Sequence, residues 1–281
     1  MKNAPLRHNT YTRLYVSEVQ PFELPQNQDF TQDIGHGGTP LEQSGWPHRQ
    51  SGVRIALMAI RVVAFDVYGT LGRWAPGGVE PIEVQRLLTR FGIEISYEAY
   101  ETARRAVMFF DSPKRPIVGW TDYLALLFAR MNVAVSTDLL VSVSNMYETR
   151  HRFDLFSDAL PAIEAARTGG MITCAFTTLP RFMVDGTGQG ISARLHHYFD
   201  ASAIGQPKGH PAFYRRIVER LGVAPSEILA VGDDSICDVE LAIEAGWRVV
   251  LLDRDSKNTS AEAAQTEVIK SLAELPKHYS E

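Results

Sequence analysis

The stretch VVAFDVYGTLGRW, residues 62–74, decides the fold. Val62–Phe65 is a continuous apolar run, as expected for a strand that is buried on both faces of a parallel sheet. The run ends on Asp66, so a carboxylate stands at the tip of the strand. Gly69 lets the chain turn sharply after it, and Thr70 can help to close that turn. The segment therefore predicts a central strand that presents one acid at its carboxyl end.

Further along the chain, apolar runs alternate with segments of helical periodicity. Strands are expected at 171–178, 201–205, 228–233 and 247–253, and helices at 159–170, 190–198, 211–222 and 237–246. Such alternation implies right-handed crossovers between parallel strands. The predicted fold is α/β, with a doubly wound parallel sheet of the Rossmann-like kind.

Residues 79–150 interrupt this pattern with four predicted helices. Val84 and Leu88 share one face of the first, and Ser96 and Ser136 are suited to cap the second and the fourth. Because this block follows the first strand, it must lie above the sheet as an all-helical cap.

The chain therefore divides into four predicted parts. They are an N-terminal extension expected to be disordered (1–57), an α/β catalytic core (58–75 and 157–255), the helical cap (76–156) and a polar C-terminal tail on the surface with one helix (256–281). One hypothesis makes Met58 the natural start, so that residues 1–57 would not belong to the natural protein.

Composition limits the classes of partner. The 281 residues carry a net charge of −5, which gives no basic footprint for nucleic acid or an anionic membrane. No apolar run reaches the roughly 20 residues that span a bilayer. With only Cys174 and Cys237, a disulfide framework is not expected, and a cytoplasmic location fits. Exposed cap helices could pair in a homodimer, although nothing in the sequence demands it.

Polar residues gather at the ends of the predicted strands. The first strand delivers Asp66, the second delivers Thr177 and Thr178, and Lys208 follows the third. The fourth delivers further acids, namely Asp233, Asp234 and, one helical turn later, Asp238. In open parallel sheets, ligands bind outside these carboxyl ends, so one common rim is expected to hold the site.

The residue types at this rim suggest a chemistry. A rigid carboxylate can act as a nucleophile that forms a covalent intermediate. A lysine neutralises charge on that carboxylate and on an anionic substrate, and a threonine hydroxyl donates to a substrate oxygen. Clustered acids repel one another unless a cation lies between them, and Mg²⁺ prefers oxygen ligands. The pattern favours a small anionic substrate and magnesium.

Four motifs in order resemble the haloacid dehalogenase-like (HAD) hydrolase superfamily, in its helical-cap subgroup close to 2-haloacid dehalogenases and related phosphatases. They are FDVYGTL (65–71), CAFTT (174–178), GQPKGHPAFY (205–214) and VGDDSICD (231–238). The resemblance implies an enzyme with Asp66 as the covalent nucleophile. It further implies that Thr177 binds the substrate anion and that Lys208 stabilises both.

The resemblance also implies a metal site. Asp66 and Asp233 would bind Mg²⁺, the backbone carbonyl of Tyr68 could be a further ligand, and Asp238 would lie in the outer coordination sphere or on Lys208. Two departures from the family pattern are Gly209-His210-Pro211 after the lysine, where Pro-Asp-Pro is more usual, and Thr177-Thr178, where Ser-Asn is common.

Tyr68 and the fourth motif point to different reactions. In the family's phosphatases the residue at position 68 is usually an aspartate that serves as general acid and base, whereas the 2-haloacid dehalogenases resemble this sequence in having tyrosine. A tyrosine is a poor base at neutral pH, because its reference pKa is about 10. Dehalogenases need no metal, however, and usually lack the first acid of the Asp233-Asp234 pair.

We therefore expect Mg²⁺-dependent, phosphatase-type hydrolysis of a small phosphorylated metabolite. The alternative is a metal-independent 2-haloacid dehalogenase, in which Arg104 or Arg105 of the cap would bind the substrate carboxylate, with Tyr68 and Thr178 also near the substrate. A further alternative is an inactive binding protein on the same fold.

Overall fold

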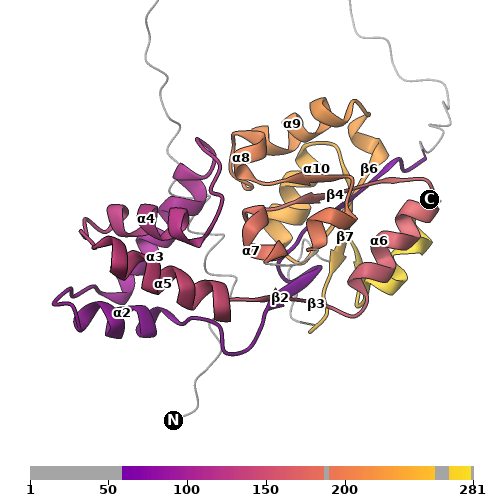
Figure 1. The fold of residues 1–281 in the computed structure, drawn as a ribbon. Coiled ribbons are helices and arrows are strands. Elements are labelled where there is room, and N and C mark those ends of the chain that lie inside the picture. Colours follow the sequence, from indigo (N-terminus) through magenta and orange to yellow (C-terminus); the bar gives the residue numbers. More distant parts are fainter. Residues whose placement is uncertain (1–58, 187–189, 257–265, 280–281) are drawn as a thin grey trace, which may run out of the picture.

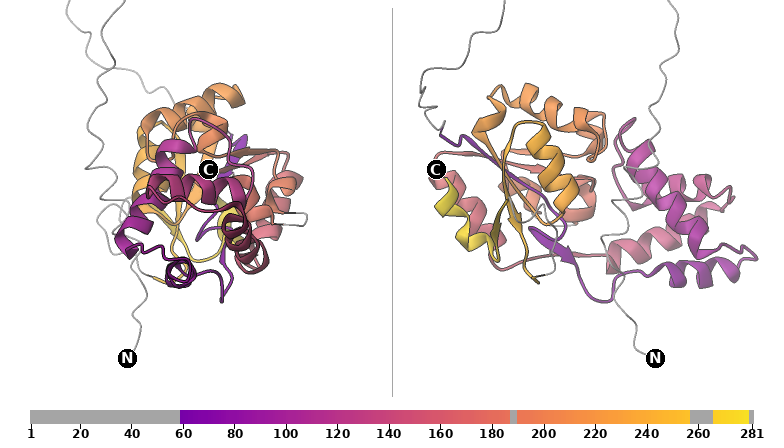
Figure 2. Two further views of the ribbon diagram at one scale, coloured as in Figure 1. Left: turned by 60° about the vertical axis from the view of Figure 1, so that its left-hand side comes forward. Right: turned by 180° about the vertical axis from the view of Figure 1, so that it is seen from behind.

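The computed structural model describes residues 59–186, 190–256 and 266–279. The predicted disorder of residues 1–57 lies outside these ranges. Within them, the chain forms an α/β core with a separate lobe of helices beside it (Figures 1 and 2).

A parallel sheet of six strands forms the centre of the core in the described part of the chain. In spatial order the strands are β5 (His197–Phe199), β4 (Ile172–Phe176), β1 (Val62–Phe65), β6 (Ile228–Gly232), β7 (Arg248–Leu252) and β8 (Glu267–Ile269). The sequence predicted a parallel α/β sheet, and this prediction is confirmed. β1 lies between β4 and β6, so the carboxyl ends of these three strands are neighbours.

Helices cover both faces of the sheet, and the strands are therefore apolar on both sides. Val62 and Ala64 pack into a cluster with Phe213 of α9, whereas Val63 and Phe65 pack on the other side. The helices of the core are α6 (Ala159–Thr168), α7 (Arg181–Asp185), α8 (Ala201–Ile204), α9 (Pro211–Leu221) and α10 (Leu241–Glu244), together with short 3₁₀ turns at Ile191–Arg194 and Pro225–Glu227. This alternation of side chains explains the continuous apolar run of β1.

Four helices between β1 and β4 form the lobe, which we call the cap. They are α2 (Pro81–Thr89), α3 (Tyr97–Ala106), α4 (Trp120–Arg130) and α5 (Thr137–Arg150), with a π-helical turn (Val107–Asp111) after α3. Ser96 and Ser136 accept hydrogen bonds from the N–H groups of Ala99 (3.0 Å) and Leu139 (3.2 Å), as the sequence predicted. The cap has an apolar interior of its own, which includes Leu124 and Leu127.

A short two-stranded ribbon joins the cap to the core, and it was not predicted from the sequence. β2 (Gly72–Trp74) pairs in antiparallel fashion with β3 (Phe153–Leu155), so that Trp74 lies opposite Phe153. The chain thus enters and leaves the cap through adjacent segments. Three-residue strands are too short to show a period in the sequence.

Two predicted elements of the core are wrong. Residues 190–198 form a 3₁₀ turn followed by β5, because Tyr198 and Phe199 bury their rings on opposite faces of the sheet. Residues 201–205 form the helix α8, whose N-terminus is capped by Asp200 (2.8 Å to the Ala203 N–H). The helix predicted at 237–246 begins earlier, as a π-helical turn at Ser235–Glu240 that continues into α10.

The expectation of a surface tail is also wrong for residues 266–279. β8 adds the sixth strand to the sheet, and the 3₁₀ helix Leu272–His278 buries Leu272 and Leu275 against α6. Charged residues lie between these apolar positions, so the sequence of residues 266–279 did not indicate that this segment contributes to the core.

Two further expectations concern the cysteines and the membrane. Cys174 and Cys237 are both free thiols. Among the described residues, no helix has the length and apolar character needed to cross a bilayer.

Candidate active site

The carboxyl ends of β4, β1 and β6 bring the predicted site residues to one rim. Asp66 follows β1, Thr177 follows β4 and Asp233 follows β6. Because β1 is the middle strand of the three, Asp66 lies between the contributions of its neighbours. Asp66 is only 7% exposed, so its carboxylate is largely shielded from solvent.

Lys208 lies between two of the acids. Its Nζ is 2.5 Å from Oδ1 of Asp66 and 2.5 Å from Oδ1 of Asp238, and it sits 4.2 Å from the centre of the Phe176 ring. Burial by itself would lower the pKa of Lys208, but Asp238 and Asp66 outweigh it and raise that pKa above its usual range. Lys208 therefore stays protonated and can balance negative charge at the rim.

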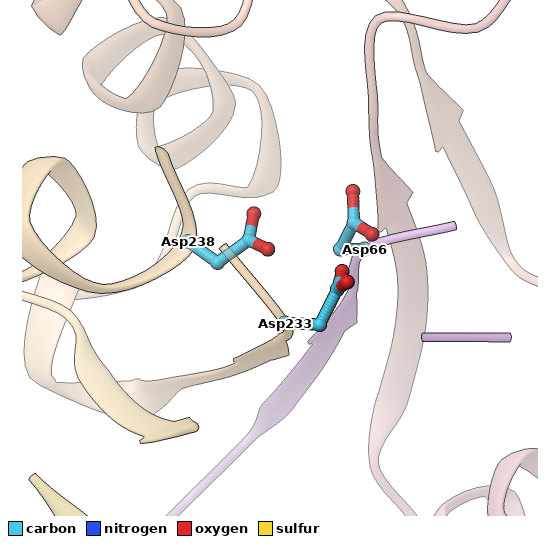
Figure 3. Close-up of side chains that lie close together, drawn as sticks. All are labelled: Asp66, Asp233 and Asp238. Carbon is cyan, nitrogen blue, oxygen red and sulfur yellow. The ribbon is translucent and has the colours of Figure 1, made fainter. Parts of the chain in front are cut away.

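Three carboxylates gather around this single ammonium group. One oxygen from each of Asp66, Asp233 and Asp238 lies within 4.8 Å of the others, and Figure 3 shows the three side chains converging from separate segments. Burial, and then the charge of Asp66, raises the pKa of Asp233 to about 7. Acids at this spacing repel one another, and all their ligand atoms are oxygens, so the group fits a hard divalent cation such as Mg²⁺.

Two glycines make room for these carboxylates. Gly69 has a φ of 87°, and a Cβ there would lie 2.2 Å from Oδ2 of Asp233. A Cβ on Gly232 would lie 2.2 Å from Oδ2 of Asp238. The steric role of Gly232 was missed from the sequence, although its position directly before Asp233 was a usable signal.

Asp234 has a local role in the loop after β6. Its Oδ1 accepts hydrogen bonds from the N–H groups of Ile236 (2.9 Å) and Cys237 (2.7 Å), which caps the π-helical turn. Its own N–H donates to Oδ2 of Asp238 at 2.9 Å. The turn therefore fixes Asp238, which is fully buried beside Lys208.

The two threonines lie at the end of β4. Thr177 is 1% exposed, and its Oγ1 accepts a hydrogen bond from the Leu179 N–H at 3.2 Å. An oxygen that accepts from the backbone can still donate its own proton, which suits an anionic ligand. Thr178 is half-buried next to it.

Tyr68 follows β1 at the rim, whereas Arg104 lies on α3 of the cap. Burial, and then Asp233, raises the pKa of Tyr68, while Arg73 and Arg104 act in the opposite direction. The charge of Arg104 on α3 is thus close enough to be felt at Tyr68. Arg104 is held by Glu101 (2.8 Å), and its side chain is 40% exposed. Arg105, also on α3, is half-buried.

Comparison with known proteins settles the family. The sequence pattern of the hydrolase family described as haloacid dehalogenase-like hydrolase matches residues 60–246, which is more than half of the chain. The chain belongs to the haloacid dehalogenase-like hydrolase family. The resemblance that the four motifs suggested is confirmed, and so is the assignment of the protein as a hydrolase.

Individual relatives of this haloacid dehalogenase-like hydrolase are distant. It is 24% identical over 235 residues to haloacid dehalogenase-like hydrolase domain-containing protein 3 of Danio rerio, an alignment that covers 77% of this chain and 95% of that protein. It is 29% identical over 137 residues to a phosphoserine phosphatase of Thermus thermophilus, an alignment that covers 46% of this chain and 53% of that protein. The crystal structure of a 2-haloacid dehalogenase from Pseudomonas syringae matches with a TM-score of 0.59 at 21% identity. The match covers 78% of this chain and 97% of that one.

In this haloacid dehalogenase-like hydrolase, the structure brings Asp66, Thr177, Lys208, Asp233 and Asp238 together at the rim. An aromatic group at the ribbon was missed from the sequence. The ring of Trp74 lies 6.1 Å from that of Tyr68 and 4.3 Å from that of His151. Burial, and then Arg104, lowers the pKa of His151 to about 4, so its imidazole is neutral. The sequence marked Tyr68 but not Trp74 or His151, because the ribbon that places Trp74 opposite Phe153 was not predicted.

Proposed function

We propose that this hydrolase cleaves a small phosphorylated metabolite in a Mg²⁺-dependent reaction through a covalent intermediate on Asp66. The observation that carries the proposal is the charge imbalance at the rim, where two buried carboxylates and the half-buried carboxylate of Asp233 lie close to one ammonium group. Such an arrangement is unfavourable unless a cation or protons compensate for it.

The carboxylates of Asp66 and Asp233 and the backbone carbonyl of Tyr68 would hold the ion, with Asp238 beside them. When bound, Mg²⁺ neutralises the acids and the phosphoryl oxygens of the substrate, which supplies electrostatic stabilisation of the transition state. The glycines at 69 and 232 leave the space that the two neighbouring carboxylates need.

The side chains divide the remaining work. One carboxylate oxygen of Asp66 forms a bond to phosphorus as the bond to the leaving oxygen breaks, and water later cleaves the resulting acyl phosphate to return free Asp66 and inorganic phosphate. The Lys208 ammonium stabilises the charge that accumulates on both partners. The Thr177 hydroxyl donates to a phosphoryl oxygen, and Thr178 lies next to it to contact the substrate.

Tyr68 explains an expected weakness of the reaction. Its raised pKa keeps the hydroxyl protonated at neutral pH, so it is a poor base towards water. We therefore expect slow turnover of phosphates whose leaving groups need a proton.

The same Tyr68 favours the alternative function, a metal-independent 2-haloacid dehalogenase. Halide departure needs no proton, and Arg104 would bind the substrate carboxylate from the cap. The structural similarity to a 2-haloacid dehalogenase does not decide between the phosphatase and the dehalogenase, because a sequence identity of 21% shows only a shared fold.

A paired assay on purified protein tests the proposal. Phosphate release from a panel of phosphomonoesters is measured with Mg²⁺ and with chelator, and chloride release from 2-chloropropionate is measured in parallel. Phosphate release that the chelator abolishes supports the proposal, whereas chelator-insensitive chloride release selects the alternative. Asp66→Asn should remove either activity, and turnover that survives this change excludes Asp66 as the nucleophile.

A further inference from the structure

An ion pair with little exposure lies behind the rim, outside the predicted site. Arg254 follows β7, and Asp158 precedes α6. The guanidinium group binds the carboxylate through two parallel hydrogen bonds, Nη1 to Oδ2 at 2.8 Å and Nη2 to Oδ1 at 2.9 Å. It also lies 4.2 Å from the centre of the Phe156 ring. This planar, two-point geometry fixes the orientation of Arg254.

Arg254 reaches from this pair into the loop that carries Asp66. Its Nη2 also donates to the backbone carbonyl of Thr70 at 2.9 Å. Thr70 is fully buried, and its hydroxyl donates to Oδ1 of Asp233 at 3.4 Å. Thr70 therefore links Arg254 on one side to a predicted metal ligand on the other.

The C-terminal segment braces the same ion pair. Oδ2 of Asp158 accepts hydrogen bonds from the Ser271 hydroxyl (2.6 Å) and the Leu272 N–H (2.9 Å). Burial acts to raise the pKa of Asp158, but Arg254, Ser271 and Leu272 overcome it and lower that pKa. Asp158 is thus charged at neutral pH and satisfied on several sides.

We propose that Arg254, oriented by Asp158, is a positioning residue that holds the loop of residues 66–72 in its active shape. The inference rests on the proposed function in one respect, namely that this loop carries the nucleophile. Without Arg254, the buried carbonyl oxygen of Thr70 would lose the donor that Arg254 supplies. The peptide would then turn towards water, and the Thr70 hydroxyl would leave Asp233.

Hydrogen exchange of the metal-free protein tests the positioning role directly. The amides of Gly69, Leu71 and Gly72 are hydrogen-bonded within the loop at 2.8, 2.9 and 3.1 Å. In Arg254→Met, exchange of the peptide that spans 66–72 should be about fivefold faster or more, while the rest of the core is unchanged. Loop exchange at the wild-type rate would overturn the inference.

Arg130→Met is the matched control. Arg130 binds Asp111 on the cap in a similar two-point pair, with Nε 2.8 Å from Oδ2, and this pair does not touch the loop. The control should leave exchange at 66–72 unchanged. If Arg254→Met does not fold, Arg254→Lys keeps the charge but loses the two-point geometry, and faster exchange confined to 66–72 is expected there too.

Calorimetric titration with Mg²⁺ separates this inference from the proposed function. Arg254→Met should bind Mg²⁺ about tenfold more weakly than wild type, as expected when an outer partner of a metal site is lost. A wild-type protein that binds no Mg²⁺ contradicts the proposed metal site, and the exchange experiment then decides the positioning role alone.

Discussion

At the scale of single residues, Asp233 gives the rim a group that titrates near neutral pH. Its carboxylate lies beside Asp66 in a place with little water, and its pKa is raised to about 7 by burial first and by Asp66 second. In the unfolded chain the same group titrates at about 3.9. The folded, metal-free protein therefore holds a proton on Asp233 that the unfolded chain has already released at intermediate pH.

This difference predicts a pH-dependent response to Mg²⁺. Because the folded pKa is the higher one, the stability from this group is fully present below about pH 4 and is lost as pH rises towards about 7. Mg²⁺ must displace the proton, so the gain in melting temperature on adding Mg²⁺ should be small near pH 5 and largest above pH 7. Melting curves recorded with Mg²⁺ and with chelator across this pH range measure the gain in melting temperature.

Asp233→Asn is the control for this prediction. It should lose the Mg²⁺ response at every pH and melt a few degrees higher than metal-free wild type near pH 8, because one buried charge is gone. An equal Mg²⁺ response of the wild type at all pH values would contradict the prediction.

Tyr68 offers a second test at this scale. Tyr68→Asp places a carboxylate where it can act as general acid and base, a role worth about 10² to 10⁴ in rate. Phosphate release from alkyl phosphates should rise, and it should rise less for aryl phosphates, whose leaving groups need little help. Steady-state rates on matched alkyl and aryl substrates measure the difference, with Tyr68→Phe as the control. An unchanged or lower rate on alkyl phosphates would contradict this view of Tyr68.

At the scale of elements, the end of β6 is the most constrained position. Gly232→Ala would drive its Cβ into the carboxylate of Asp238, which is fixed by the turn after it. The displaced acid should lower kcat by about 10²-fold, since shifts of about 1 Å have that effect. The comparison is with Gly119→Ala, where a Cβ meets nothing within 4 Å. Equal activity of the two variants would show that Asp238 can move without loss.

The elements also show which parts of the fold the sequence could predict. β1, β4 and β6 were found because strands buried on both faces read as apolar runs, and the site residues followed from their ends. β5, α8 and β8 have three or four residues each, so neither a strand nor a helical period is visible. The Asp200 cap before α8 was a usable signal for a helix. The role of Arg254 could have been suspected from its place after β7.

At the scale of the whole molecule, aromatic contacts hold the cap against the core. The ring of Trp120 on α4 lies 5.2 Å from that of Phe182 on α7, and Met183 packs into the interior of the cap. Phe182 and Met183 both lie on α7, which begins at Arg181, shortly after Thr177 and Thr178. We therefore expect movement of the cap to be coupled to the loop that would bind the substrate anion.

Loss of this contact should loosen the cap without touching the rim. Phe182→Ala is expected to raise KM by about threefold to tenfold and to change kcat less, because a cap that rests open must be closed by the substrate. Steady-state kinetics measures this split. Phe91→Ala, at an exposed ring on the outer side of the cap, is the control and should leave both constants unchanged. A loss confined to kcat would contradict the proposed coupling.

The ribbon β2–β3 offers a single site at which the cap could be exchanged for another domain. The Ala75 N–H donates to the Arg152 carbonyl at 2.8 Å, so the two ends of the inserted segment are already clasped to each other. A foreign insert with closely spaced termini can be spliced at this single point without disturbing the register of the parent sheet. Chimeras built there should keep Asp66, Lys208 and Asp238 in place, because these residues belong to the core, and should take a new selectivity from the donor.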